Sequence, residues 1–500
     1  MPSSAPTPAR RVIVALGRAV GGVVLLGLTA CSTTAPGSQA PPGGSPPPPA
    51  ASEDVPLSDA ALRAATSDTE EDSVYPEVGD PLVDALHYQL DVSWTPEADR
   101  LDAVETLRFR ATDDADRIPL DFSDALTISS LSVDGADASW DLEGKDLSVD
   151  HPVAADQDYL LQLAYSGSPE AYPAPSTRPD FAGGIGWTTT DDHEVWTLQE
   201  PYGAFTWYAV NDQPADKAFY DFTLSVPAPW TGVANGALTA SEEEDGVRTT
   251  RWHLDAPASS YLVTIAFGDY RATDLPPVHG VPITVWSAAD EPGTPGQTAY
   301  ASRAMRWLER LLGPYPFDTL GILVVPGESG MESQTMITLG DTPYATSRDV
   351  VVHELAHHWY GDAVTPADWR DMWMNEGMAM YLQAMWEAQD RGVPVAEVID
   401  GWARTEAAER KAAGPPGDYD PAQFGSGNVY YGPALMWQEL RERIGDRAFL
   451  DVLRAWPRTH EYGSATREEY VAWIERRTGA ELSDFFDAWL LDPTTPSREN

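Results

Sequence analysis

The hydrophobic pattern of this chain of 500 residues changes its period once, after VPITVWS (281–287). Before that point, short runs alternate between apolar and polar residues, as in YQLDVSW (88–94) and FYDFTLSV (219–226), and Asp-Gly, Asn-Gly or Pro separates them. A period of two is typical of β-strands with one buried face. The pattern therefore predicts an antiparallel, all-β domain over residues 82–272, built as a β-sandwich or saddle.

Beyond residue 287 the apolar residues take helical spacing, apart from the short apolar strand predicted at GILVVP (321–326). In AYASRAMRWLERLLG (299–313) they form one stripe, and a Gly-Pro pair ends the run. Most of residues 349–491 follow the same period. We predict a second, mostly helical domain over 273–495, so the fold class is an α+β multidomain protein.

The first residues have the composition of an export signal. Two arginines precede a short apolar run that ends at Cys31, the only cysteine, as in secretory signal peptides. The last residues of this run, LTAC, resemble the bacterial lipobox, in which the cysteine is lipidated. We predict a lipoprotein signal peptide over 1–31, lipidation of Cys31, and a disordered tether over 32–80. The expected location is the outer face of a bacterial cell membrane, attached through the lipid alone.

The charge balance excludes whole classes of partner. The chain has 32 basic and 78 acidic residues, a formal net charge of −46. Nucleic acid and anionic membrane surfaces would repel such a chain. The acidic excess indicates a soluble surface, and an acidic cleft that favours cationic substrates is the alternative interpretation. A single cysteine allows no disulfide within the chain, and we expect a monomer.

The stretch DVVVHELAHHWYGD contains three of the nine histidines. His353 and His357 are four residues apart, so on a helix they share one face and can bind one metal ion, with Glu354 beside the open coordination position. A third ligand, Glu376, follows in the second amphipathic stretch WMNEGMAMY. Two histidines and a glutamate are typical of a catalytic zinc site, so we predict one zinc ion per chain. His358 points about 100° away from His357 and is expected to pack or to form hydrogen bonds.

The run HELAHHWYGDAV, followed by NEG, resembles the gluzincin metallopeptidases of the aminopeptidase N and leukotriene hydrolase family. The similarity covers residues 85–495 in order and spacing. It implies a thermolysin-like catalytic domain with zinc on His353, His357 and Glu376, and Glu354 as the general base for an attacking water. The implied reaction releases N-terminal amino acids from peptides with a free N-terminus. The similarity also implies no large C-terminal helical domain of the kind that larger relatives add.

A loop before the zinc motif extends this resemblance. SGMES (329–333) is similar to the family's loop Gly-Ala-Met-Glu-Asn, whose glutamate grips the free α-amine of the substrate. The resemblance implies a substrate site at Gly330, Met331 and Glu332. The serines at both ends of the loop depart from the family pattern.

Two further segments resemble parts of the family's active site. LQEP is similar to the segment at the edge of the site, which implies Gln199 and Glu200 as the second half of the amine site. VYYGPALMWQELRERIGDRAF is similar to the family's tyrosine-containing helix start. This similarity implies Tyr430 as the phenol that stabilises the oxyanion, with Tyr431 as the alternative, and it places Pro433 in the first turn of the helix.

The pattern departs from relatives at one supporting position and admits other functions. Seven residues past Glu376, relatives often carry a carboxylate; here the residue is Gln383, and if this position orients a ligand imidazole the metal is held less tightly. With no helical domain over the cleft, the same site could serve an endopeptidase, an oligopeptidase or an epoxide hydrolase. An inactive surface binding module is the alternative from another class.

Overall fold

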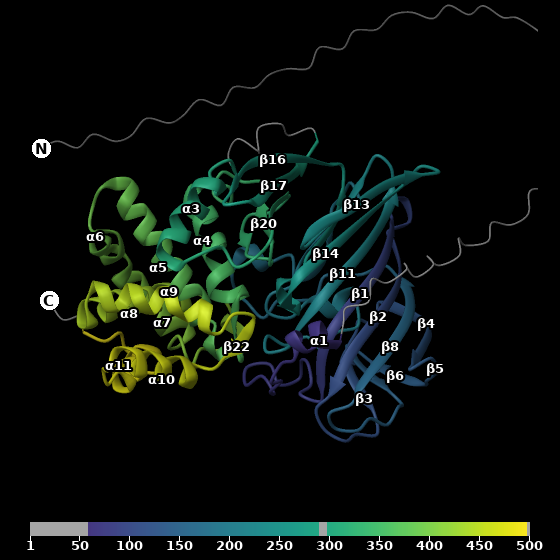
Figure 1. The fold of residues 1–500 in the computed structure, drawn as a ribbon, viewed down its shortest axis with the longest axis horizontal. Helices are drawn as coiled ribbons and strands as arrows, with labels where there is room; N and C mark the ends of the chain where they lie inside the picture. The colour runs from purple at the N-terminus through teal and green to yellow at the C-terminus, as the bar shows by residue number, and fades with distance from the viewer. Residues whose placement is uncertain (1–58, 290–297, 498–500) are drawn as a thin grey trace, which may run out of the picture. The chain divides into compact units, whose positions relative to one another are not determined.

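The computed structural model describes residues 59–289 and 298–497 (Figure 1). The predicted signal peptide, Cys31 and most of the predicted tether lie outside these residues. Within them, no helix is both long and apolar enough to cross a membrane.

Residues 59–80 are folded, so the prediction of a disordered tether is wrong for this part. The segment starts with α1 (Asp59–Leu62) and a 3₁₀ turn (Arg63–Ala65). The buried carboxylate of Asp72 then accepts a hydrogen bond of 2.7 Å from the backbone N–H of Trp369. A contact across almost 300 positions of sequence ties the segment to the helical domain. Its acidic, weakly patterned sequence contains no local sign of that contact.

The N-terminal domain is built on an eight-stranded sheet with the order β13-β14-β11-β1-β2-β8-β4-β5. Its strands run side by side in Figure 1. Neighbours are antiparallel, as predicted, except that β1 and β11 run parallel in the middle. The strands are β1 (Val83–Thr95), β2 (Arg100–Ala111), β4 (Leu126–Val133), β5 (Ala136–Asp137), β8 (Asp158–Gly167), β11 (Lys217–Pro227), β13 (Ala237–Glu244) and β14 (Val247–Ser259).

Two smaller sheets complete this domain. A four-stranded sheet has the order β12-β15-β10-β9, and a three-stranded sheet has the order β3-β7-β6. Strand β10 matters for the site because it ends directly before Gln199 and Glu200. The strands are β3 (Ile118–Asp121), β6 (Trp140–Glu143), β7 (Asp146–Val149), β9 (Gly186–Thr189), β10 (Val195–Leu198), β12 (Thr231–Ala234) and β15 (Ile265–Gly268).

A five-stranded sheet joins the two halves of the chain. Its order is β16-β17-β18-β20-β19, and β18 is buried along its whole length. Ile322 and Val324 of β18 pack into the core formed with the helices, whereas Leu323 and Val325 pack into the core of the N-terminal domain. Burial on both faces explains why this strand is a continuous apolar run. The strands are β16 (Tyr270–Val278), β17 (Val281–Ala288), β18 (Leu320–Val325), β19 (Gly330–Met331) and β20 (Met336–Gly340).

The rest of the described chain is mostly helical, as predicted, with one short parallel pair of strands, β21 (Val364–Pro366) and β22 (Gly463–Ala465). Helix α3 ends at Gly313, which has a positive φ of 103°. The helices are α3 (Ala301–Leu312), α4 (Arg348–His357), α5 (Trp373–Arg391), α6 (Val395–Ile399), α7 (Ala403–Ala413), α8 (Gly427–Ile444), α9 (Asp446–Thr459), α10 (Arg467–Thr478) and α11 (Ser483–Leu490).

Helices α5 and α8 approach closely where Gly377 of α5 faces Pro433 of α8. A Cβ atom at Gly377 would lie 2.2 Å from the Cβ of Pro433, so only glycine fits. The prediction that Pro433 lies in the first turn of its helix is wrong, because α8 already begins at Gly427. The contact matters for function because the residue before Gly377 is the predicted ligand Glu376, and α8 carries Tyr430.

We expect Gly377→Ala to reduce the free energy of unfolding by about 1–3 kcal/mol, because the added methyl group must push the two helices apart. Gly401→Ala is the matched control, since a Cβ atom there meets no other atom within 4 Å, and it should change stability by less than about 0.5 kcal/mol. Urea unfolding followed by circular dichroism measures both. Equal stability of the two variants would contradict the close contact.

Candidate active site

Helix α4 holds two of the predicted metal ligands. The Ser347 side chain caps the N-terminus of α4 by accepting a hydrogen bond from the N–H of Val350. All residues of α4 from Val350 to His357 are buried. The regular helix ends at His357, and Gly361 then turns the chain with a φ of 144°. This turn lets the chain continue through the short strand β21 into α5.

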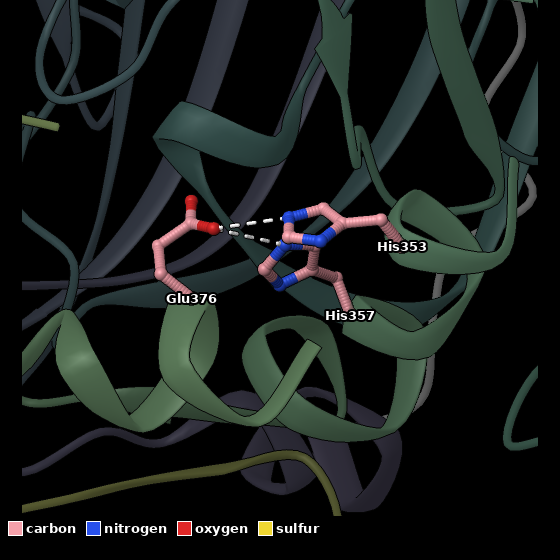
Figure 2. A group of neighbouring side chains, drawn as sticks. All are labelled: His353, His357 and Glu376. Carbon is pink, nitrogen blue, oxygen red and sulfur yellow. Dashed lines mark hydrogen bonds and ion pairs between the residues drawn. The ribbon is translucent and has the colours of Figure 1, made fainter. Parts of the chain in front are cut away.

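Helix α5 brings Glu376 against α4. As Figure 2 shows, Glu376 and the two imidazoles point toward one another from two helices. The Oε2 atom of Glu376 lies 3.1 Å from the Nε2 atom of His353 and 3.4 Å from the Nε2 atom of His357. One ligand atom from each of the three residues lies within 4.8 Å of the others, and all three side chains are buried. The structure therefore brings together the three residues predicted to bind metal.

The chemistry of these donors fits a zinc ion. The Nδ1 atom of His357 lies 3.2 Å from the carbonyl oxygen of Tyr360, so the proton resides there and the Nε2 lone pair faces Glu376. Among the described residues this buried Nε2 atom has no hydrogen-bond partner. Burial lowers the pKa of His353, although Glu376 and Gln383 oppose this by hydrogen bonding. Burial lowers the pKa of His357 as well, but Glu332 and Glu376 raise it well above its usual value. Two imidazoles and a carboxylate form the ligand set of a catalytic zinc site, and a bound metal ion would take the place of the imidazole protons.

Glu354, the predicted general base, lies against the backbone of Gly330. A Cβ atom at Gly330 would be 2.2 Å from the Oε1 atom of Glu354. Gly330 and Met331 form strand β19, at the edge of the five-stranded sheet. The Met331 side chain is buried in a cluster with Tyr261 and Trp369. This strand therefore places a glycine beside the base and leaves one backbone edge facing the cavity.

Two further glutamates complete an acidic cluster. One carboxylate oxygen from each of Glu200, Glu332 and Glu376 lies within 4.8 Å of the others. The Oε1 atom of Glu332 is buried without a hydrogen-bond partner among the described residues and lies 3.9 Å from the Nδ1 atom of His357. Burial, together with Glu332 and Glu376, raises the pKa of Glu200 well above its usual value. These buried carboxylates favour the binding of a cation.

Gln199 does not face the site, so its predicted role in binding the amine is wrong. Its Nε2 group donates to the carbonyl oxygens of Ser260 and Val263 at 2.7 and 2.6 Å, and its Oε1 atom accepts from the indole N–H of Trp207. Its side chain is fully buried and satisfied. Gln199 instead holds the chain in place directly before Glu200.

Tyr430 lies closer to the metal ligands than Tyr431. The Tyr430 ring stacks on His353, with 6.0 Å between the ring centroids, whereas Tyr431 packs against Trp402. The phenol oxygen of Tyr430 accepts a hydrogen bond of 2.9 Å from Arg178. Arg178 was not predicted from the sequence, because it stands in a Pro- and Ser-rich loop of the other domain and no motif surrounds it.

Arg178 and the predicted catalytic, substrate-binding and metal-binding residues line one cavity of about 830 Å³, with the exception of His357 and Gln199. Among the residues that the structure describes, seven carboxylates line it against a single guanidinium, that of Arg178. His358, predicted to pack or form hydrogen bonds, lies outside this cavity. Its Nδ1 atom is 2.6 Å from the hydroxyl of Tyr315, and burial lowers its pKa to about 3.

Comparison with known proteins agrees with this geometry. The family model of the Peptidase M1 N-terminal domain matches residues 84–262, and the model of the Peptidase family M1 domain matches residues 298–489. The chain belongs to peptidase family M1. Membership confirms the predicted family, the two-domain fold class and zinc as the cofactor of an M1 metallopeptidase.

Individual M1 relatives match over different lengths. Aminopeptidase N of Streptomyces lividans is 25% identical over 337 residues, which are 60% of this chain and 38% of that protein. Leucine aminopeptidase 2 of Pyricularia oryzae is 26% identical over 60% of this chain and 51% of its own length. This M1 chain thus spans about half of these curated relatives or less. A crystal structure of a mutant M1 zinc metallopeptidase from Deinococcus radiodurans, bound to a Tyr-Ser-Ala substrate, has a TM-score of 0.77 and 26% identity, and covers 86% of this chain and 99% of that one.

We expect Gly330→Ala to reduce the kcat of this M1 peptidase by about 100-fold, because a methyl group there displaces the base Glu354. Zinc content, measured by atomic absorption, should stay at the wild-type level because the three ligands do not move. Gly327→Ala is the control, since a Cβ atom there makes only ordinary contacts of 3.6 Å or more. A Gly330→Ala enzyme with wild-type kcat would contradict the assignment of Glu354.

Proposed function

We propose that this protein is a zinc-dependent aminopeptidase, which hydrolyses the first peptide bond of peptides with a free N-terminus. The observation that carries the proposal is the position of Glu332 and Glu200. Both carboxylates are buried beside the three metal-binding residues, and each has an oxygen within 4.8 Å of Glu376. Two carboxylates at that point can bind the substrate ammonium, which is attached to the α-carbon directly next to the scissile carbonyl group.

The remaining groups fit the chemistry of peptide hydrolysis. His353, His357 and Glu376 would hold a zinc ion, which when bound would act as a Lewis acid on the scissile carbonyl and increase the acidity of water. Glu354 accepts the proton of the attacking water and passes it to the leaving amine. Tyr430 donates a hydrogen bond to the oxygen on which negative charge develops.

The substrate backbone fits the free edge of β19. Within the described part of the chain, Gly330 and Met331 pair with β20 on one side only, so their other backbone edge is available to an extended peptide. The relatives support the same reaction: two are named aminopeptidases, and a related structure holds a peptide of three residues. Seven carboxylates in the cavity favour substrates with additional positive charge.

The proposal is tested with aminoacyl-4-nitroanilides and with an N-blocked, internally quenched peptide. We expect release of nitroaniline from the free-amine substrates only, its loss on zinc chelation, and its recovery when zinc is restored. Glu354→Gln should keep zinc and lose activity by about 100- to 10,000-fold. Cleavage of the blocked peptide would identify an endopeptidase instead, and zinc binding without any hydrolysis would identify a binding module.

We expect Glu332→Gln to raise the KM for free-amine substrates by about 10- to 100-fold, because a charge-assisted hydrogen bond to the ammonium contributes about 1.5–3 kcal/mol. Glu328→Gln is the matched control. It removes another carboxylate that lines the cavity but does not belong to the buried cluster, and its KM should stay within about threefold of wild type. Equal effects of the two substitutions would mean that only the overall charge of the cavity matters.

We further propose that the protein is exported and acts as a monomer that a lipid on Cys31 attaches to the outer face of the cell membrane. The sequence LTAC at the end of an apolar run supports this proposal. Metabolic labelling with a radioactive fatty acid should mark the wild-type chain and leave a Cys31→Ser variant unlabelled. Labelling of both chains, or of neither, would contradict lipidation at Cys31. The oligomeric state of the soluble form is measured separately by analytical sedimentation.

A further inference from the structure

A loop of the N-terminal domain reaches the catalytic helix α8. This loop, residues 173–184, leaves after β8 and returns to β9, and paired backbone hydrogen bonds between Tyr172 and Ile185 close its base. Its tip docks on residues 423–425, the turn directly before α8. The contacts are a 3.1 Å hydrogen bond from Phe424 N–H to the carbonyl of Pro175, and 2.8 Å hydrogen bonds from Ser176 to the carbonyl of Phe424 and from Thr177 to the side chain of Gln423.

The loop directs the guanidinium of Arg178 at the site. Its Nε and Nη2 atoms donate to the two carboxylate oxygens of Asp180, at 3.1 and 2.5 Å. Its Nη1 atom donates to the carbonyl of Gly425 at 3.0 Å and to the phenol oxygen of Tyr430 at 2.9 Å. Burial raises the pKa of Asp180, but hydrogen bonds from Arg178 and Ser329 lower it below its usual value. The two hydrogen bonds to the Asp180 carboxylate thus hold the guanidinium in one orientation.

This contact decides where the phenol proton of Tyr430 points. A guanidinium has five N–H donors and no acceptor, so Tyr430 accepts from Arg178 and directs its own O–H elsewhere. The ring stacks on His353, and the charges of Glu376 and Glu200 act on the pKa of the Tyr430 phenol, so the hydroxyl lies near the metal-binding cluster. A positive charge 2.9 Å behind the oxygen also makes the phenol a stronger hydrogen-bond donor.

We propose that Arg178 is a positioning residue for Tyr430: its hydrogen bond to the phenol oxygen directs the phenol O–H toward the carbonyl oxygen of the scissile peptide bond. This inference rests on the proposed function, because it assigns Tyr430 to that oxygen. It makes the N-terminal domain part of the machinery that stabilises the transition state. Arg178 does not serve as an anchor for the substrate's own carboxylate, since four of its five N–H groups already donate within the protein.

The test is a double-mutant cycle with Arg178→Gln and Tyr430→Phe on leucine-4-nitroanilide, a substrate without a carboxylate. We expect Arg178→Gln to lower kcat by about 10- to 100-fold with KM within about threefold, and Tyr430→Phe to lower kcat by about 100- to 1,000-fold. The double variant should match Tyr430→Phe within about threefold, because Arg178 acts only through the phenol. Losses that multiply, or a loss confined to KM, would overturn the proposal.

Two other variants separate positioning from loop docking. Thr177→Val removes one docking hydrogen bond and leaves the Arg178–Tyr430 contact, so its kcat should stay within about twofold of wild type. Asp180→Asn loosens the guanidinium without removing it. Its kcat should fall less than that of Arg178→Gln, and the fall should vanish in the Tyr430→Phe background. A Thr177→Val enzyme as impaired as Arg178→Gln would show that docking alone matters.

A binding measurement tests the inference even if no substrate is turned over. A phosphinic dipeptide analogue carries a tetrahedral group in place of the scissile carbon, and calorimetry on the zinc-loaded protein gives its Kd. Arg178→Gln should weaken binding by about 10-fold when Tyr430 is present, and by less than about twofold when it is Phe. Equal weakening in both backgrounds would overturn the role of Arg178, whereas failure of hydrolysis alone would overturn only the proposed function.

Discussion

The burial of four glutamates around two imidazoles is the constraint on which the rest of the structure depends. Glu200, Glu332, Glu354 and Glu376 come from four separate segments and lose most of their hydration. Burial raises the pKa of Glu200 and Glu354 well above their usual values, and neighbouring carboxylates add to the effect. Such a cluster is costly unless cations or protons balance it. A divalent metal ion and a substrate ammonium would meet that need together, so metal binding and the proposed preference for a free amine share one electrostatic origin.

The five-stranded sheet keeps the four segments in place. Alternate residues of β18 pack into two different cores, one with the helices and one with the N-terminal domain. The two domains therefore pack against opposite faces of one strand, in addition to being connected along the chain. The β-domain contributes Glu200 at the end of β10 and Arg178 on its loop, and the helical domain contributes the metal-binding triad and Tyr430. Neither domain alone would contain all of the groups that form the site.

Sequence patterns predicted the elements that depend on local spacing. The sequence predicted the helix with His353 and His357, the second helix with Glu376, and the change from strands to helices. These features were predictable because hydrophobic periodicity and a four-residue interval depend only on local backbone geometry. Errors arose where a contact spans long distances in sequence. The order of residues 59–80 depends on Asp72 bonding to Trp369, and the role of Gln199 depends on carbonyl groups more than 60 positions away.

The sequence by itself determined the chemistry of the metal site, because two histidines one turn apart, with a glutamate between them and another on the next helix, allow few other arrangements. It also determined the fold class through its two hydrophobic periods. Only the tertiary structure decided which glutamates reach the metal site, that Gly330 leaves room for Glu354, and that Arg178 meets Tyr430 across 252 positions. These contacts depend on how sheets and helices pack, and packing between distant segments leaves no periodic signal in the chain.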